Sequence, residues 1–182
     1  FDVSILKLEK GVFQVLSTAG DTALGGDDLD RAIAVEVLER SATPFSSLDT
    51  AAQGQWLSQC RDAKEHLSTH DHAELCWQGT AFLLQQSQFE RLADPWIART
   101  LACCDDALRD AGLTPQAIAG VVLVGGSTRI PHVKRQVEAF FGKTPLDSVD
   151  PDLVVALGAA LQAEALTEGS DTLLLDVTPL SL

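Results

Sequence analysis

Two glycine-rich segments, each placed between a predicted strand and a predicted helix, are the residues best suited to bind a phosphate or a nucleoside. The first is Leu24-Gly25-Gly26-Asp27-Asp28, and the second is Gly125-Gly126-Ser127-Thr128-Arg129. Glycines in such a turn leave backbone N–H groups accessible at the positive end of the next helix, which is favourable for an anion. A plain turn explains either segment taken alone. Two such segments in one short chain favour a nucleotide-binding fold.

A cation and a carboxylate add to this interpretation. Arg129 directly follows the second glycine pair and its Ser-Thr, and a planar guanidinium at that point can stack on a base. Asp2 stands at the edge of the first predicted strand. Because Mg²⁺ is usually held through few carboxylates and several waters, Asp2 could hold a metal-bound water. Seen alone, Asp2 is a surface aspartate.

Histidine and cysteine side chains offer weaker candidates. His66 and His70 have the i, i+4 spacing of one helix face, with His72 nearby. The segment Ser68-Thr69-His70-Asp71 is typical of a helix end, which would break that face, so we disfavour a metal site. No Cys-x-x-Cys pair, zinc-ligand spacing or Ser-His-Asp arrangement is present. We interpret the cysteines as reduced and buried: Cys60, Cys76, Cys103 and Cys104.

Composition limits the classes of function. The 182 residues are 46% hydrophobic and 21% charged, which is typical of a globular chain. With 26 acidic and 13 basic residues the net charge is -13, which opposes broad binding to nucleic acid or anionic lipid. No apolar run approaches the roughly 20 residues of a membrane helix. The first residues lack a basic-then-apolar pattern, so we expect no leader. We therefore expect a cytoplasmic protein without nucleic-acid or membrane partners. Because the sequence has no Met and stops inside an apolar run, we also expect a segment of a longer polypeptide.

The predicted elements describe an α/β chain with a helical insertion at about residues 43–86. Hairpin strands are expected at residues 1–8 and 12–18, and a strand buried on both faces at 121–124. A short strand pair is expected around residues 75 and 82, and a strand-like segment at 173–175. Ser87 and Glu90 are interpreted as a capping box that opens a long helix. Other helices are expected at about residues 28–40, 50–67, 131–141 and 150–166.

Four segments in this order resemble the DnaK-type heat-shock chaperones. They are residues 1–6 (FDVSIL), 20–30 (GDTALGGDDLD), 124–131 (VGGSTRIP) and 173–182 (LLLDVTPLSL). The resemblance implies an actin-like ATPase lobe, which is a ribonuclease H-like β-sheet with flanking helices, carrying a small inserted α+β subdomain. It identifies residues 1–167 with the second lobe of the nucleotide-binding domain, 168–176 with the interdomain linker and 177–182 with the start of the substrate-binding domain.

The same resemblance implies ATP or ADP with Mg²⁺ as cofactors. Asp2 would hold Mg²⁺ through water, and Leu173, Leu174 and Leu175 would couple the linker to the nucleotide state. The family's first lobe and its Asp-Leu-Gly-Gly-Gly-Thr phosphate loop would precede residue 1, so we expect the complete protein to be an ATPase and this chain alone to be inactive. The implied nucleotide contacts are Gly26, Lys64, Ser68, Gly125, Gly126, Ser127, Arg129 and Asp152.

Two residues depart from the usual pattern of general chaperones in this family. Arg61 stands where an acid is usual, and Glu65 stands where a base-stacking arginine is usual. A carboxylate cannot supply that stacking, so we expect weaker nucleotide binding and faster release. The chain resembles the HscA branch, which serves iron–sulfur cluster assembly, in three features. These are the two departures, the short insertion and the segment Trp77-Gln78-Gly79.

That branch implies two partners, a J-domain cochaperone and an iron–sulfur scaffold protein or an unfolded client peptide. One alternative is a general protein-folding chaperone of the DnaK type. Another is an isolated, non-catalytic nucleotide-binding module, which magnesium-dependent turnover by this chain would exclude. A sugar kinase of the same fold has no support, because it requires a sugar pocket and leaves residues 176–182 unexplained.

Overall fold

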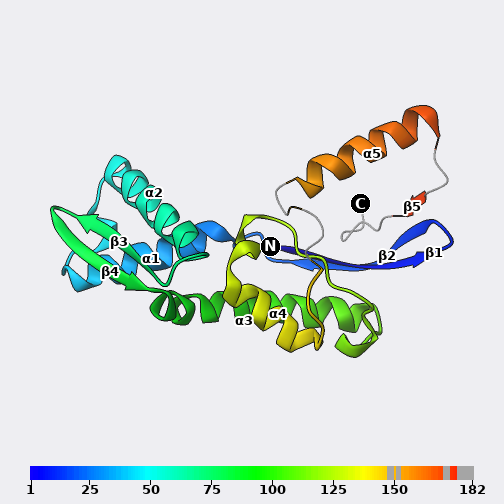
Figure 1. The fold of residues 1–182 in the computed structure, drawn as a ribbon, viewed down its shortest axis with the longest axis horizontal. Coiled ribbons are helices and arrows are strands. Elements are labelled where there is room, and N and C mark those ends of the chain that lie inside the picture. Colours follow the sequence, from blue (N-terminus) through cyan, green and yellow to red (C-terminus); the bar gives the residue numbers. More distant parts are fainter. Residues whose placement is uncertain (147–149, 151–152, 170–172, 176–182) are drawn as a thin grey trace. The chain divides into compact units, whose positions relative to one another are not determined.

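The structure is a computed structural model that describes residues 1–146, 150, 153–169 and 173–175. It divides into two compact units. The first unit comprises Phe1–Ala23, Arg99–Arg129 and Val133–Leu182, and the second comprises Leu24–Ala98 and Ile130–His132. Helices and strands are mixed in the chain, as Figure 1 shows. The α/β prediction is therefore confirmed.

The sheet of the first unit has three strands in the order β1-β2-β5. β1 (Asp2–Glu9) pairs antiparallel with β2 (Val12–Gly20), and β5 (Leu173–Leu175) pairs parallel with β2. The turn between β1 and β2 has Lys10 at φ 49° and Gly11 at φ 82°, a geometry that suits a two-residue hairpin with glycine at its second position. This confirms the predicted hairpin.

Two helices cover one face of this sheet. The carboxyl-terminal part of α3 (Gln86–Asp110) and α4 (Pro131–Phe141) contribute to the core of the first unit. The Ser17 hydroxyl donates a buried hydrogen bond of 2.7 Å to the Ala107 carbonyl, which fixes β2 against α3. Gly142 directly follows α4 and terminates it with a φ of +65°. The buried core consists of Ile5, Cys104, Ala107, Leu108, Val137 and Phe141.

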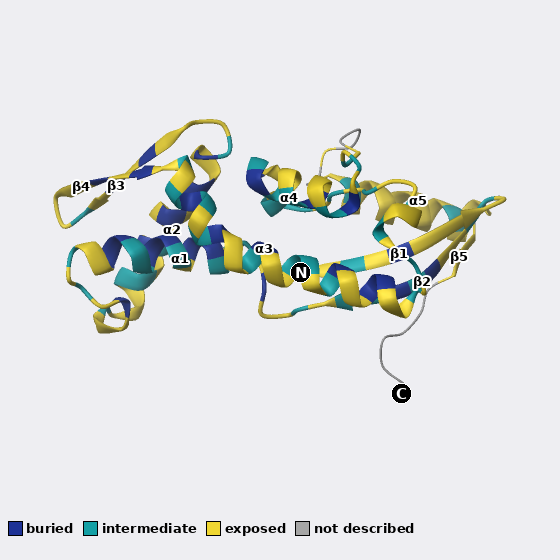
Figure 2. Ribbon diagram, turned by 90° about the horizontal axis from the view of Figure 1, so that it is seen from below, coloured by how far each residue is buried: buried dark blue, intermediate teal, exposed yellow. Residues whose placement is uncertain are grey.

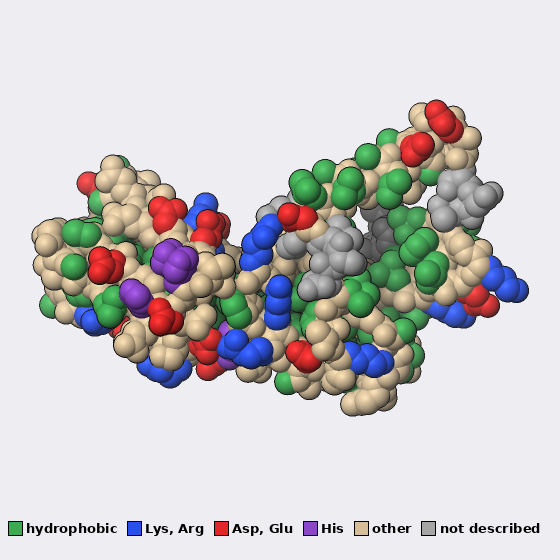
Figure 3. Space-filling model, in the orientation of Figure 1, with side chains coloured by type: hydrophobic (Ala, Val, Ile, Leu, Met, Phe, Trp, Pro, Cys, Tyr) green, Lys and Arg blue, Asp and Glu red, His purple; other side chains and the backbone are tan. Residues whose placement is uncertain are grey.

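The remaining helix of the first unit, α5 (Val154–Glu168), is exposed along most of its length (Figure 2). Figure 3 shows hydrophobic side chains along it; Val155, Leu161 and Leu166 are each more than half exposed. Within the described residues, no helix is both long and apolar enough to cross a membrane.

The second unit packs two helices against a strand hairpin and the start of α3. α1 (Gly26–Arg40) and α2 (Thr50–His66) are followed by β3 (His72–Trp77) and β4 (Thr80–Gln85), which pair antiparallel. Trp56 is fully buried, and its indole N–H donates a 3.2 Å hydrogen bond to the Ala34 carbonyl. Other core side chains are Ile33, Val37, Leu38, Leu67, Leu84 and Phe89.

Two local predictions were wrong. Helix α3 begins at Gln86, directly after β4, and the Gln88 side chain accepts a 2.9 Å hydrogen bond from the Gln85 N–H. The predicted capping box at Ser87 and Glu90 is therefore replaced by an interaction two residues earlier. Residues 121–124 are not a buried strand: Val122 is 58% exposed and forms only an isolated parallel bridge with Leu146. An apolar run becomes a buried strand only where neighbouring strands pair with it on both sides.

Three short 3-10 helices complete the described elements. They are Phe45–Ser47, Pro115–Ala117 and Gly126–Arg129. The second begins with Pro115, whose fixed φ suits the first position of a helix. The third lies within the second glycine segment.

Candidate nucleotide site

The second glycine segment, residues 125–129, is a tight turn held by Thr128. The Thr128 hydroxyl and the Thr128 N–H both donate to the Gly125 carbonyl, at 2.6 Å and 3.0 Å. Gly125 has a φ of +90°, which L side chains rarely adopt, so glycine is required here for its backbone conformation. The sequence predictions Gly125, Gly126, Ser127 and Arg129 therefore lie on one short, fixed turn.

Arg129, at the end of this turn, forms an ion pair with Asp150. Arg129 Nη2 lies 2.9 Å from Asp150 Oδ1, and both side chains are about half exposed, at 50% and 47%. The Asp150 carbonyl accepts hydrogen bonds of 3.1 Å from the N–H groups of Leu153 and Val154. The pair thus joins the glycine turn to the residues that precede α5.

The first glycine segment opens α1. The Gly25 N–H donates to Asp28 Oδ2 at 2.8 Å, and the Asp28 N–H donates to the Gly25 carbonyl at 3.2 Å. Asp27 and Asp28 lie in the first helical turn, where carboxylates complement the helix dipole. The predicted helix start is confirmed.

A buried carboxylate, Asp30, connects α1 with α2. Its side chain is 2% exposed; Oδ1 lies 2.7 Å from Lys64 Nζ and Oδ2 lies 3.0 Å from Arg61 Nε. Lys64 Nζ also donates to the Gly26 carbonyl at 3.0 Å, and Arg61 Nη2 lies 2.7 Å from Asp27 Oδ1. Oδ2 accepts a hydrogen bond from Arg61 Nε, whereas Oδ1 has no hydrogen-bond partner and is compensated by the Lys64 charge. A buried charge is tolerated when it is paired in this way.

These contacts affect neighbouring ionisable groups. The hydrogen bond with Asp30 raises the pKa of Arg61 above its ordinary value. Burial, together with the Asp30 charge, raises the pKa of the Cys60 thiol to about 12, and burial raises that of Cys104 to about 11. Both thiols are therefore protonated at neutral pH and are poor nucleophiles and metal ligands. Cys76 is exposed and Cys103 is half-buried, so the expectation that all cysteines are buried was wrong for these two.

The other predicted site residues lie as follows. Ser68 follows the end of α2, and its hydroxyl makes a long contact of 3.5 Å with the Lys64 carbonyl. Asp2 is exposed on β1 opposite Gly20. A Cβ on Gly20 would lie 2.5 Å from the Phe1 carbonyl oxygen and 2.8 Å from Asp2 Oδ1, so only glycine fits beside Asp2. Asp152 lies outside the described residues.

The structure therefore places the predicted site residues in two separate groups, one in each unit. Gly26, Lys64 and Ser68 form one group in the second unit, while residues 125–129 form another in the first unit, which also contains Asp2. Sequence reasoning missed the carboxylates Asp30 and Asp150, which hold the two predicted cations. The i, i+3 spacing of Asp27 and Asp30 places both carboxylates on one helix face, but it does not distinguish the buried acid from the exposed one.

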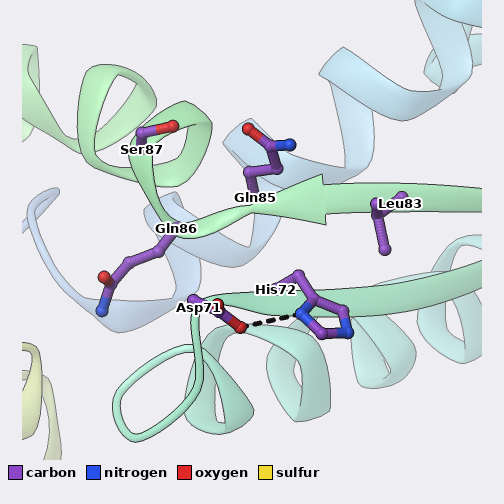
Figure 4. A pocket seen from close by; sticks show the side chains of 6 residues that line it. All are labelled: Asp71, His72, Leu83, Gln85, Gln86 and Ser87. Atoms are coloured by element: carbon purple, nitrogen blue, oxygen red, sulfur yellow. Dashed lines mark hydrogen bonds and ion pairs between the residues drawn. The ribbon is translucent and has the colours of Figure 1, made fainter.

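A shallow pocket in the second unit carries an adjacent Asp–His pair (Figure 4). His72 Nδ1 lies 2.8 Å from Asp71 Oδ1, and this hydrogen bond lowers the pKa of Asp71. Figure 4 shows Ser87 on the first turn of α3, on a different element and away from the imidazole ring. The three side chains do not form a Ser-His-Asp arrangement.

The histidines of the α2 end do not converge on a metal site. The rings of His66 and His70 stack at 3.7 Å between centroids with an angle of 7°, a geometry in which the ring nitrogens do not point at one centre. Among the described residues, no group of three or more His, Cys, Asp or Glu side chains is arranged to hold a metal ion.

Comparison with known proteins gives consistent relatives. The family model described as Hsp70 protein matches residues 1–182. The chain is 50% identical over 189 aligned residues to "Chaperone protein HscA homolog" of Azotobacter vinelandii, covering 100% of this chain and 30% of that protein. It is 48% identical over 185 residues to the HscA homolog of Haemophilus influenzae strain PittEE, and 48% over 188 residues to "Chaperone protein HscA" of Pectobacterium carotovorum, with the same coverage. The chain thus spans about 30% of the length of these relatives.

Proposed function

Because this chain belongs to the Hsp70 family, we propose that it is the second lobe of an ATP-binding domain and contributes the adenosine side of a shared nucleotide site. The observation that carries this proposal is the turn of residues 125–129, a fixed glycine turn that ends in a guanidinium. Gly125 and Gly126 allow close approach of a ligand to the backbone, and Arg129 supplies a flat cation for the base.

The group around Lys64 would contribute the ribose side. Lys64 Nζ donates to the Gly26 carbonyl and pairs with Asp30. An ammonium group has three donors, and the hydrogen bond to Gly26 uses one of them. A ribose hydroxyl is a suitable acceptor for an ammonium donor, with Ser68 one helical turn further on.

Asp2 fits a role in holding Mg²⁺ through water. Its carboxylate is exposed, and its backbone is fixed opposite Gly20, where no side chain fits. A single carboxylate suits an ion that keeps most of its waters. When bound, Mg²⁺ neutralises phosphate charge. The Asp2 carboxylate would accept a hydrogen bond from a metal-bound water and so orient that water.

The pairing of β5 with β2 supports coupling through the linker. Leu173, Leu174 and Leu175 pair with Val12, Phe13 and Gln14, and the Leu173 N–H donates 3.0 Å to the Gly11 carbonyl. We propose that this added strand is made in one nucleotide state and released in the other, which transmits the state of the ATPase lobe to a substrate-binding domain. Residues 177–182, assigned to the start of that domain, lie outside the described residues, as does residue 176 of the linker.

We further propose that the complete protein is an ATP-dependent chaperone of the HscA branch that acts in iron–sulfur cluster assembly in the cytoplasm. The HscA relatives support the branch, and a J-domain cochaperone and an iron–sulfur scaffold protein are its proposed partners. Arg61 also supports it, since this departure from the general pattern is held by Asp27 and Asp30. A general folding chaperone remains the alternative, and comparable binding of a scaffold peptide and of unrelated unfolded peptides would favour it.

Calorimetric titration of ADP with Mg²⁺ tests the proposed lobe. The titration uses this chain and the chain joined to the first lobe of a relative. We expect tight binding and ATP turnover only for the joined protein, and weaker affinity than that of a general DnaK-type ATPase domain because Glu65 cannot stack on the base. Absence of binding by the joined protein would overturn the proposal, and turnover by this chain alone would overturn its division into lobes.

A further inference from the structure

We propose that Asp150 is a positioning residue for Arg129: its carboxylate holds the edge of the guanidinium and so orients the flat face for stacking on a nucleobase. This inference rests on the proposed nucleotide site. It adds a residue that was not among the sequence predictions. The contact that carries it is the 2.9 Å distance between Arg129 Nη2 and Asp150 Oδ1.

The two backbones that carry this pair are themselves held. Arg129 ends a turn that Thr128 closes through both its hydroxyl and its N–H. Asp150 precedes α5, and its carbonyl accepts hydrogen bonds from Leu153 and Val154. The ion pair therefore joins the closed glycine turn to the start of α5, and the arginine side chain is held at its backbone and at its guanidinium.

The geometry of a guanidinium explains why this pairing leaves stacking possible. All five N–H groups lie in the guanidinium plane, so a carboxylate binds at the edge of the group. The two π faces are not used by such a contact. A half-exposed arginine loses side-chain entropy when it stacks, and a carboxylate that already restrains it reduces that loss.

Charge gives a second role to the same contact. Asp150 without its partner would place an uncompensated negative charge at the proposed site of an anionic nucleotide, and Arg129 neutralises it. This electrostatic effect would obscure the positioning effect if ADP were the probe, because removing the carboxylate also removes a repulsion. Adenosine carries no charge and reports the stacking contact alone.

The test measures adenosine affinity of the full-length protein that carries this segment, for the wild type, Asp150→Asn, Asp150→Glu, Arg129→Ala and the double variant Asp150→Asn with Arg129→Ala. We expect Asp150→Asn to weaken adenosine binding by about two- to fivefold, the range of an exposed ion pair, and Asp150→Glu to restore part of it. In the Arg129→Ala background, Asp150→Asn should have no further effect.

A matched control separates this pair from exposed ion pairs in general. Asp105 pairs with Arg109 at 3.1 Å on the surface of α3, in the same unit. Asp105→Asn should leave adenosine affinity unchanged. As a second readout, ¹⁵N relaxation of the Arg129 guanidinium should show slow rotation in the wild type and faster rotation in Asp150→Asn, which a purely structural role of Asp150 would not produce.

Each outcome decides the proposal. Weaker binding that disappears in the Arg129→Ala background supports it. Tighter binding by Asp150→Asn would overturn it and make Asp150 a competitor of the base. Wild-type binding with no change in Asp150→Asn overturns this inference alone, whereas absence of adenosine and ADP binding in every variant overturns the proposed nucleotide site and this inference with it.

Discussion

Each of the two glycine segments is accompanied by a cation paired with an aspartate, but the first pair is buried and the second is half exposed. At the first, the cation Lys64 is paired with Asp30, and the two side chains are 10% and 2% exposed. At the second, Arg129 is paired with Asp150, and both side chains are about half exposed. A buried pair is costly to break because one uncompensated charge remains in the core, whereas an exposed pair is screened by water and salt. We infer that the first pair fixes the fold and the second tunes a ligand contact.

The largest effect is expected at the buried pair. Asp30→Ala should lower the free energy of unfolding of the second unit by about 3 to 5 kcal/mol, because Lys64 would keep a buried charge without its partner. The fluorescence of Trp56, Trp77 and Trp96 during urea unfolding measures this, since these tryptophans all lie in the second unit. The matched control is Asp27→Ala, whose side chain is 91% exposed. If the two substitutions lowered the free energy of unfolding equally, Asp30 would not be a buried ion-pair partner that stabilises the unit.

The next effect concerns the thiol beside Asp30. Cys60 has a pKa of about 12, so at pH 8 its thiolate fraction is about a thousandfold below that of an ordinary thiol of pKa about 8.5. We expect Cys60 to resist alkylation while the exposed Cys76 reacts, as read by mass spectrometry of peptides. Asp30→Ala should make Cys60 reactive, because the unit opens more often. Rapid alkylation of Cys60 in the wild type would show that the thiol beside Asp30 is not buried.

The sequence predicted the local conformations better than the ion pairs. Both hairpins follow from their turn residues, Gly11 and Gly79, each at positive φ. The start of α1 follows from its acidic first turn. Asp30 looks the same in sequence as a surface acid, and only the packing of α2 on α1 buries it beside Lys64.

The start of α3 and the conformation of residues 121–124 also differ from the predictions. Each depends on contacts between residues distant in sequence. The Gln86 N–H donates to the Asp71 carbonyl at 2.8 Å, which carries β4 directly into α3 and moves the helix start away from Ser87. The apolar run at residues 121–124 is visible in the sequence, but the sequence does not show whether other strands pair with it. The site residues themselves came from a motif resemblance, and Asp150 was missed because its contact with Arg129 joins residues 21 positions apart.

A smaller effect is expected at the exposed pair when its cation is changed. Arg129→Ala in the joined two-lobe protein should weaken ADP binding by about tenfold, within the range of a partly desolvated cation–π contact. Arg129→Lys keeps the charge but removes the planar surface, so it should recover only part of this loss. Calorimetry measures both. Full recovery by lysine would mean that charge, rather than stacking, is the contribution of Arg129.

The smallest effect is expected from salt. Raising the salt concentration from about 0.05 M to about 0.5 M shortens the screening length several-fold, so the coupling between Asp150 and Arg129 in adenosine binding should fall by about twofold. The unfolding cost of Asp30→Ala should stay the same. The opposite result would contradict this difference between the buried and the exposed pair. In that case the unfolding cost of Asp30→Ala would depend on salt, and the coupling between Asp150 and Arg129 would not.

The proposed nucleotide site can be tested directly by NMR, by following the backbone amide signals of the two-lobe protein while ADP and Mg²⁺ are added. We expect the largest shifts at residues 125–129 and around Gly26 and Lys64, with little change at β3 and β4. Shifts confined to β3 and β4, or none at residues 125–129 under saturating ADP, would contradict the assignment of these segments to a nucleotide site.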